Sequence, residues 1–235
     1  MTQILRFSSP DALGDLGRFA TRAATFDSDG AIRLQTSGTV LAAWVGIVAG
    51  TGILGEGAVL GLRTFALAEP AEPGELDVAV PLRAIIDRTA RGVYAGSELH
   101  VPPTEALAPW AALTPPRSGW ELVGEIDADL LAEVGQSGIA EVTVALAERG
   151  AAAGFARDRI WSRPIREVVR PGAVDAETGP LDGSSGVTPG VGEMRAGGAL
   201  AAYGLGFLRP GSTVGVHRCG RWTRLSAVGG YVLMR

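Results

Sequence analysis

Three short stretches of the chain place an arginine beside a tryptophan, and such a pair could bind an anion. They are Pro115–Trp120, Trp161–Pro164 and Arg221–Arg224. A guanidinium group suits a carboxylate or phosphate, and a neighbouring indole offers a flat surface for stacking. With the residues around them, the candidate anion- or partner-binding set is Arg117, Trp120, Trp161, Arg163, His217, Arg218, Arg221, Trp222 and Arg224. The alternative interpretation is that each indole anchors the core while its arginine stays in solvent.

His217 and Cys219 lie two residues apart on a predicted strand, so both side chains could point to one face of a sheet. A thiolate nucleophile needs a base and a positive field, which His217 and the neighbouring arginines could supply. A lone cysteine is more often a small buried apolar residue. We therefore predict no catalytic residue and leave the reactivity of this pair open.

No known metal or cofactor motif is present in the chain. Two histidines and one cysteine give none of the usual zinc spacings. The four glycines of Gly50–Gly57 lack the spacing of a dinucleotide-binding loop, and Glu56 within them would repel a phosphate. This segment is predicted to be a hairpin loop, and we expect neither a metal nor a cofactor.

The charge of the chain is divided unevenly along its length. Residues 1–148 contain nine arginines and nineteen acidic residues, a net charge of −10. Residues 149–235 contain twelve arginines and six acidic residues, a net charge of +6, so the total is −4. No acidic side chain follows Glu193. An arginine-rich, acid-free end needs an anionic partner or an acidic surface of its own protein.

All 21 basic residues are arginine, and the chain has no lysine. This excludes a lysine Schiff base, a lysine general base and a P-loop lysine. A guanidinium stays protonated, so it cannot shuttle protons. The single cysteine, the absence of a signal-peptide pattern, and an apolar run of only Val40–Ala49 favour a cytoplasmic protein without a membrane span.

The apolar periodicity predicts an α+β fold: a mostly antiparallel sheet with packed helices and a C-terminal β-meander. Helices are expected from Pro10, from Pro81 and from Asp127 to about Arg149, the last one broken near Gly135–Gly138. Strands are expected at 3–7, 31–36, 39–49, 58–68, 76–80, 98–101, 120–127, 213–218, 220–225 and 230–235, with Gly38 breaking the chain between the second and third.

The domain organisation is predicted to be a single domain with one insertion. Residues 1–170 form the α+β core, and residues 193–235 complete the same domain with a helix and the meander. Residues 171–192 contain six glycines and three prolines and almost no bulky apolar side chains. Such a composition buries too little surface to offset its ordering entropy, which predicts a flexible loop.

Pro115–Trp120, Trp161–Pro164 and Gly220–Arg235, on this lysine-free background, resemble a family of uncharacterised proteins from high-GC Gram-positive bacteria. The resemblance runs along most of the chain. It implies a cytoplasmic bacterial protein and supplies no reaction, substrate or fold.

The function we expect is that of a non-catalytic interaction module whose Arg-rich C-terminal part contacts an acidic surface, which could belong to a second copy in a homodimer. One alternative is a transferase or hydrolase in which Arg117, Arg163 and Arg221 hold an anionic small molecule and His217 carries the proton. A second alternative is single-stranded nucleic-acid binding, which the isoelectric point near 5.3 disfavours.

Overall fold

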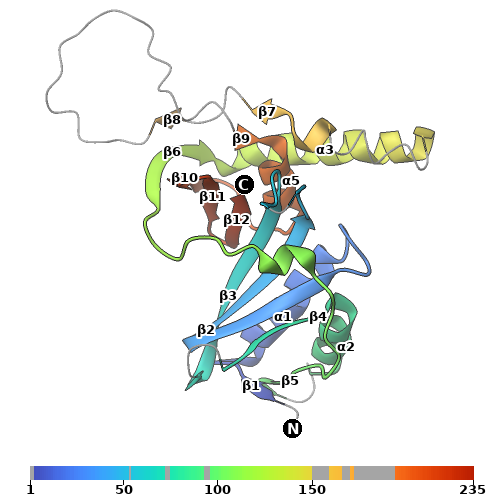
Figure 1. The fold of residues 1–235 in the computed structure, drawn as a ribbon, viewed down its shortest axis with the longest axis vertical. Coiled ribbons are helices and arrows are strands. Elements are labelled where there is room, and N and C mark those ends of the chain that lie inside the picture. Colours follow the sequence, from blue (N-terminus) through green and yellow to red (C-terminus); the bar gives the residue numbers. More distant parts are fainter. Residues whose placement is uncertain are drawn as a thin grey trace, which may run out of the picture.

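The computed structural model describes residues 3–52, 54–71, 75–92, 96–149, 159–165, 170–171 and 194–235. The fold is α+β, as predicted, with one large antiparallel sheet and helices packed on it (Figure 1). The sheet runs in the order β4 (Asp77–Pro81), β2 (Ala31–Val48), β3 (Val59–Ala71), β12 (Gly230–Met234), β11 (Trp222–Ala227), β10 (Thr213–Cys219), β6 (Glu121–Asp127) and β8 (Arg170–Pro171). Two short pairs lie outside it: β1 (Ile4–Arg6) with β5 (Glu98–His100), and β7 (Pro164–Ile165) with β9 (Met194–Arg195).

The two halves of the chain, residues 3–112 and residues 115–235, both contribute helices to the same core. The helix pair of the first half is α1 (Pro10–Ala23) and α2 (Leu82–Gly92), and that of the second half is α3 (Ala128–Arg149) and α5 (Ala196–Gly204). The Phe19 ring of α1 stacks on Phe207, which follows α5, with 5.8 Å between the ring centroids. One apolar cluster therefore joins the two halves behind a single sheet.

The helices begin where side chains cap their first turn. The Ser9 hydroxyl accepts a hydrogen bond from the backbone N–H of Ala12 at 3.2 Å, and Pro10 occupies the first helical position of α1. At the start of α3, the Asp127 carboxylate accepts the N–H of Asp129 at 2.8 Å. Both starts follow the sequence prediction, because a capping side chain and the following apolar periodicity are local signals.

The predicted strand break at Gly38 is wrong. Residues 31–48 form one strand, β2, and Gly38 lies within it with φ of 55°. The pairing of β2 with β3 shifts register between Gly38 and Val40, so the glycine produces a bulge instead of a turn. The strand continues because β3 on one side and β4 on the other supply partners along its length.

The predicted interruption of α3 near Gly135–Gly138 is also wrong, because the helix is continuous from Ala128 to Arg149. The two glycines are buried contacts. A Cβ at Gly135 would lie 2.6 Å from the Cβ of Tyr203, and one at Gly138 would lie 2.7 Å from Leu200 Cδ1. Glycine here allows α3 to approach α5 closely, and the packing offsets its low helix propensity.

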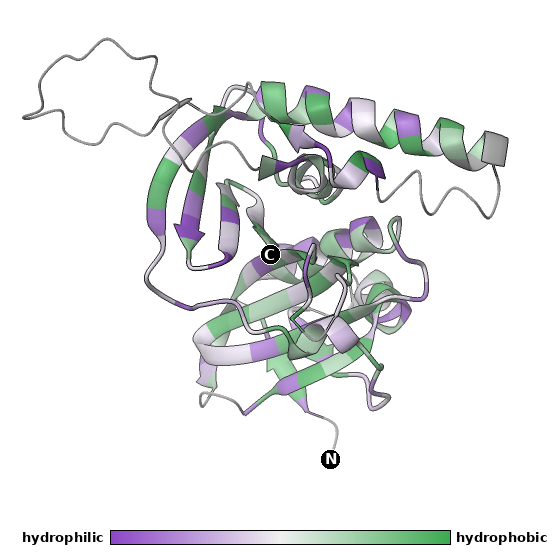
Figure 2. Cartoon of the chain, turned by 45° about the horizontal axis from the view of Figure 1, so that its top comes forward, coloured by the Kyte–Doolittle hydropathy of each residue, from purple (hydrophilic) through white to green (hydrophobic). Residues whose placement is uncertain are grey.

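A second apolar cluster lies on the opposite side of the sheet. It contains Leu60, Trp222 and Leu233 from the strands and Trp110 from the short 3-10 helix η1 (Pro109–Ala112). The Cβ that Gly46 lacks would lie 2.4 Å from Trp110 Cδ1, so the indole rests directly on β2. Successive side chains of a strand point to opposite faces of the sheet, so one face carries the main core and the other the second cluster (Figure 2). The five prolines between residues 102 and 119 predict a connection between two halves of the fold, and this segment crosses the sheet and packs on it.

Parts of two sequence predictions lie outside the described residues. The predicted flexible loop at 171–192 falls there except for residue 171, which belongs to β8. The sequence through Phe155 and Ile160 to Trp161 also predicts helix, of which only residues 159–161 are described, and these are helical.

Candidate functional site

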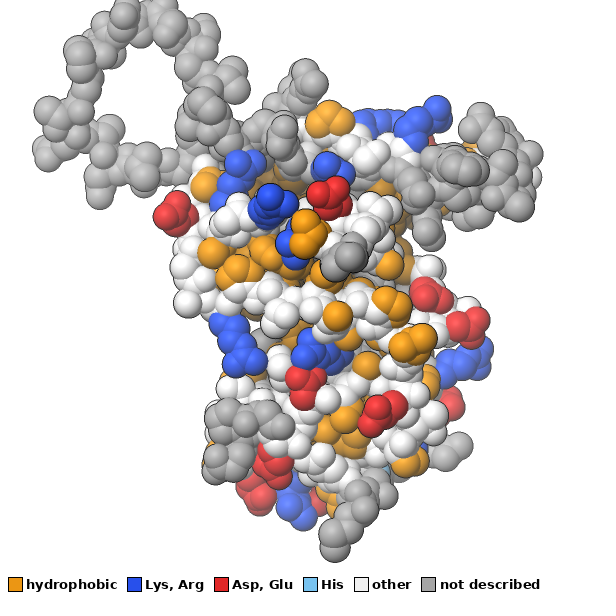
Figure 3. Space-filling view, in the orientation of Figure 1, with side chains coloured by type: hydrophobic (Ala, Val, Ile, Leu, Met, Phe, Trp, Pro, Cys, Tyr) orange, Lys and Arg blue, Asp and Glu red, His pale blue; other side chains and the backbone are white. Residues whose placement is uncertain are grey.

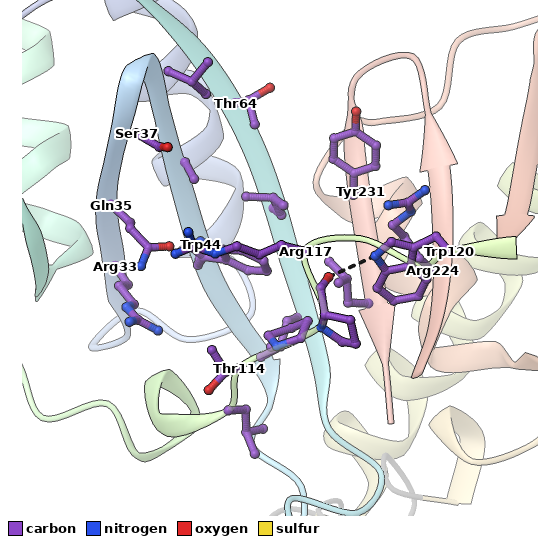
Figure 4. A pocket seen from close by; sticks show the side chains of 18 of the residues that line it. Arg33, Gln35, Ser37, Trp44, Thr64, Thr114, Arg117, Trp120, Arg224 and Tyr231 are labelled. Atoms are coloured by element: carbon purple, nitrogen blue, oxygen red, sulfur yellow. Dashed lines mark hydrogen bonds between the residues drawn. The ribbon is translucent and has the colours of Figure 1, made fainter. Parts of the chain in front are cut away.

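A groove of about 380 Å³ runs between the sheet and the connection that crosses it. We call it the aromatic groove, and Figure 4 shows it from close by. Strands β2, β3, β11 and β12 form its floor, and residues 110–120 form its other wall. The side chains that line it are Arg33, Gln35, Ser37, Val40, Ala42, Trp44, Leu60, Leu62, Thr64, Trp110, Leu113, Thr114, Pro115, Pro116, Arg117, Trp120, Arg224, Tyr231 and Leu233.

At one end of the groove, an arginine is neutralised by an internal acid. The Nε of Arg33 donates to one carboxylate oxygen of Asp77 at 2.6 Å, and its Nη2 donates to the other at 2.7 Å. The Gln35 amide also donates to Asp77, at 3.0 Å. The hydrogen bonds from Arg33 are the main reason why the pKa of Asp77 lies below its ordinary value, with a smaller effect from the charge of Arg117.

At the other end, an arginine is held between aromatic rings without an acid. The guanidinium of Arg224 lies 4.6 Å from the ring centroid of Trp120 and 5.5 Å from that of Tyr231. Figure 4 shows these three side chains together on one side of the groove, with Arg33 and Gln35 on the other and Trp44 between them. Burial lowers the pKa of Arg224, because taking a cation out of water disfavours its charged form.

We call Trp120, Arg224 and Tyr231 the aromatic clamp, and hydrogen bonds fix its position. The indole N–H of Trp120 donates to the carbonyl oxygen of Pro116 at 2.9 Å, the dashed line of Figure 4. The Nε of Arg224 donates to the hydroxyl of Ser226 at 3.1 Å. Among the described residues, no carboxylate lies within ion-pair distance of Arg224. The clamp therefore presents a preformed cation with unused donors.

His217 lies opposite Arg224 on the neighbouring strand and shares its serine. The Nδ1 of His217 is 3.2 Å from the Ser226 hydroxyl. Burial, and secondarily the positive charge of Arg224, lower the pKa of His217 and so favour the neutral ring. The thiol of Cys219 instead faces the carbonyl oxygen of Ser118 at 3.7 Å. His217 and Cys219 thus have separate partners.

A second group of arginines surrounds two adjoining hollows at the end of β12. We call Arg195, Arg218, Arg221 and Arg235 the arginine cluster. The hollows have volumes of about 470 and 310 Å³, and Glu56 is the one acidic side chain that lines them in the described part of the chain. Figure 3 shows basic side chains gathered on this upper half of the molecule.

The cluster is built on a fixed backbone. The carbonyl oxygen of Arg235 accepts the N–H of Gly57 at 2.8 Å, and its own N–H donates to Ala58 at 3.1 Å. Its guanidinium lies over the ring of the buried Trp222, 5.5 Å from the centroid. Arg218 faces Glu121 across the strand pair β10–β6, but the two do not form an ion pair.

In the predicted arginine–tryptophan pair at Trp161–Pro164, the fold separates the indole from the guanidinium. Trp161 is buried, and its ring meets Phe26 edge-on at 5.9 Å. It also lines a hollow of about 650 Å³ together with Arg159, Arg195 and Arg235. Arg163 turns outward and binds Glu141 through both oxygens, at 3.2 and 2.9 Å.

The predicted residues therefore lie in different places. Arg117, Trp120 and Arg224 line the aromatic groove, Arg218 and Arg221 belong to the arginine cluster, and Trp222 lies beneath Arg235. The three arginines of the enzyme alternative, Arg117, Arg163 and Arg221, do not share a cavity.

Sequence reasoning missed the groove residues contributed by the first half of the chain. Trp44 and Leu62 were read only as parts of strands, and Trp110 only as part of a proline-rich connection. The available signal was alternation, because Ala42 and Trp44 fall on the face of β2 opposite to the core residues Leu41, Ala43 and Val45. A bulky indole on the less buried face of a strand indicates a second covered surface.

The described residues contain neither a group of metal-binding side chains nor a membrane-spanning helix. No group of three or more His, Cys, Asp or Glu side chains in this part of the chain could hold a metal ion. No helix within it is long and apolar enough to cross a membrane.

Comparisons with known proteins match the chain in two parts. Residues 1–112 match the family model described as Domain of unknown function (DUF8010), and residues 115–235 match Domain of unknown function (DUF8185). No curated protein matches the chain. The fold is similar to that of the DNA polymerase III beta subunit from Thermotoga maritima, with a TM-score of 0.51 and 16% identity; the match covers 99% of this chain and 64% of that one. Because the second model spans just over half of the chain, the protein belongs to the family described as Domain of unknown function (DUF8185).

Proposed function

We propose that this protein is a non-catalytic interaction module whose Arg-rich C-terminal part contacts an acidic protein surface. The observation that carries the proposal is the arginine cluster: Arg195, Arg218, Arg221 and Arg235 share two adjoining hollows with a single acidic side chain, Glu56, among their described lining residues. Four cations against one anion leave a local excess of positive charge that a carboxylate-rich segment would relieve.

The chemistry of the cluster favours binding over catalysis. Its cations are all guanidinium groups, which donate hydrogen bonds in a fixed fork but do not exchange protons near neutral pH. Arg235 is held against Trp222, and backbone hydrogen bonds fix its strand. A partly ordered set of donors loses less entropy on binding than four free side chains. The fold is also similar to a subunit of a DNA polymerase, which supports an interaction role without naming a partner.

The acidic surface could belong to a second copy of the chain, because residues 1–148 carry a net charge of −10. Association of this kind is electrostatic, so it weakens as salt is added. Light scattering across a salt series therefore distinguishes the two sources. A mass that rises at low salt identifies a second copy, whereas a constant mass assigns the acidic surface to a different protein.

The proposal is tested with fluorescein-labelled octaglutamate in a polarisation assay at low ionic strength. The double variant Arg195→Glu/Arg221→Glu should weaken binding by roughly tenfold or more, since two close charge pairs become repulsive. The matched control Arg83→Glu/Arg209→Glu makes the same change in net charge at two exposed arginines outside the cluster. It should stay within about twofold of the native protein.

Three outcomes contradict the proposal. The first is an equal loss in the control, which would show that only net charge matters. The second is a native protein that does not bind octaglutamate at low salt. The third is tighter binding of labelled oligothymidylate than of octaglutamate, which would favour the nucleic-acid alternative. The further proposals, an origin in a high-GC Gram-positive bacterium, a cytoplasmic location and a single-domain organisation, are independent of this assay.

A further inference from the structure

The aromatic groove has the size and lining of a site for a small molecule. Its volume of about 380 Å³ lies within the range of ligand pockets, roughly 300–1,000 Å³. Apolar side chains come from both walls: Ala42, Trp44 and Leu62 from the sheet, and Leu113 and Pro115 from the connection. Such a lining takes an apolar body from water, and the few polar groups at the ends decide its orientation.

The two ends of the groove differ in how their arginines are paired. Arg33 is matched by Asp77 through two short hydrogen bonds, and the charge of Arg117 also acts on Asp77. Arg224 is stacked between Trp120 and Tyr231, and its Nε is used by Ser226. No hydrogen bond from either Nη of Arg224 is found among the described residues. A partly buried cation without a counter-ion is unfavourable until an anion reaches it.

The acid-free end is also preorganised for one flat anionic group. The Trp120 indole is fixed to the Pro116 carbonyl, and the ring in turn covers one face of the guanidinium. The free edge of a guanidinium matches the two oxygens of a carboxylate. A single partly buried cation balances a monoanion better than the two charges of a phosphate monoester.

We propose that the aromatic groove binds a small carboxylic acid with an apolar body, its carboxylate at Arg224 and its body between Trp44 and the wall formed by Leu113 and Pro115. This site is separate from the arginine cluster and does not depend on the proposed interaction with an acidic protein. Both Nη groups of Arg224 donate to the carboxylate, whereas Arg33 at the opposite end is already engaged by Asp77.

The test compares 1-naphthaleneacetate with its neutral amide, 1-naphthaleneacetamide, by isothermal titration calorimetry on the full chain. The acid should bind the native protein more tightly than the amide by at least about tenfold, as a hydrogen bond to a charged group predicts. In Arg224→Met the two compounds should bind alike, because the apolar stem remains while the charge is lost. Arg209→Met, at an exposed arginine outside both the groove and the arginine cluster, is the matched control and should keep the preference.

A second variant keeps the test decisive if Arg224→Met does not fold. Ala42→Phe fills the groove from the floor and leaves Arg224 in place, so it should abolish binding of both compounds. The proposal is overturned if the native protein does not distinguish acid from amide, or binds neither at millimolar concentration. It is also overturned if either groove variant retains the native preference, or if Arg209→Met loses it.

Discussion

The two halves of the chain treat their arginines differently. In residues 3–112, Arg6, Arg18, Arg33 and Arg63 each form an ion pair with a carboxylate. In the described part of residues 115–235, Arg163 alone forms one, with Glu141. The second half instead places its arginines on aromatic rings or around shared hollows. Ion pairs thus engage several arginines of the first half, whereas most described arginines of the second half have no carboxylate partner.

The halves are otherwise built on the same packing device. Each lays a pair of helices on the sheet, and in each pair a glycine permits close contact. A Cβ at Gly17 of α1 would lie 2.6 Å from the Thr89 hydroxyl of α2, and one at Gly135 of α3 would lie 2.8 Å from the Ala199 carbonyl oxygen of α5. The two halves therefore have similar helix packing and differ in how their surface arginines are paired.

The largest effect on stability should come from disturbing the packing within these helix pairs. Gly135→Ala introduces a Cβ that overlaps Tyr203 and the backbone of Ala199, so either α3 or α5 must shift. We expect the free energy of unfolding to fall by about 1–3 kcal/mol, as for other overpacked contacts. Urea denaturation followed by circular dichroism measures it. Gly17→Ala should show a similar loss, because Thr89 lies equally close.

Gly14→Ala is the matched control for both variants. The nearest atom to its Cβ is Nη1 of Arg18 at 3.5 Å, an ordinary contact with a flexible side chain. Alanine has the higher helix propensity, so this variant should gain about 0.5–1 kcal/mol. A gain of the same size in Gly135→Ala would show that α3 and α5 are not closely packed. The helix pairs of the two halves would then not pack in the same way.

Local signals made most of the fold predictable. Ser9, Pro10 and Asp127 indicate the starts of helices, because capping involves only neighbouring residues. The glycines were misread because their role depends on distant partners: Gly38 on the register against β3, and Gly135 on contact with α5. Local sequence shows that a glycine is present, and not whether it ends an element or admits a neighbour.

The candidate site was predictable only in part, for the same reason. Arg117, Trp120 and Arg224 were identified from their adjacency in sequence, and the fold brings them to one groove. Of their other neighbours, Trp44 comes from a strand far away in the chain, whereas Tyr231 lies on β12, the strand that pairs with that of Arg224. Arg163 had the same local pattern, yet its partner Glu141 lies 22 residues away and turns it into an ordinary ion pair.

A smaller effect should separate a paired arginine from an unpaired one. Arg33→Met leaves the Asp77 carboxylate without its two main donors. Both side chains are partly exposed, so we expect a loss of about 1 kcal/mol in the free energy of unfolding. Arg221→Met removes an exposed cation with no ion-pair partner among the described residues and should stay within about 0.5 kcal/mol of the native protein.

Urea denaturation of both variants in the same buffer gives the comparison directly. Added salt should reduce the effect of Arg33→Met only slightly, because its hydrogen bonds are short and partly shielded from solvent. Equal losses in the two variants would mean that Arg221 has an intramolecular role, and the contrast between the two halves would not hold.

The smallest effect concerns pH and reports on the burial of His217 beside Arg224. Burial and the charge of Arg224 lower the pKa of His217 below its ordinary value of 6.5. Between that lowered pKa and 6.5 the unfolded chain binds more protons than the folded one, so stability falls as the pH drops through this window. Above pH 6.5 the contribution is fully present. His217→Gln should flatten the dependence of stability on pH in this window. An unchanged slope in His217→Gln would show that neither burial nor the charge of Arg224 lowers the pKa of His217 in the folded chain.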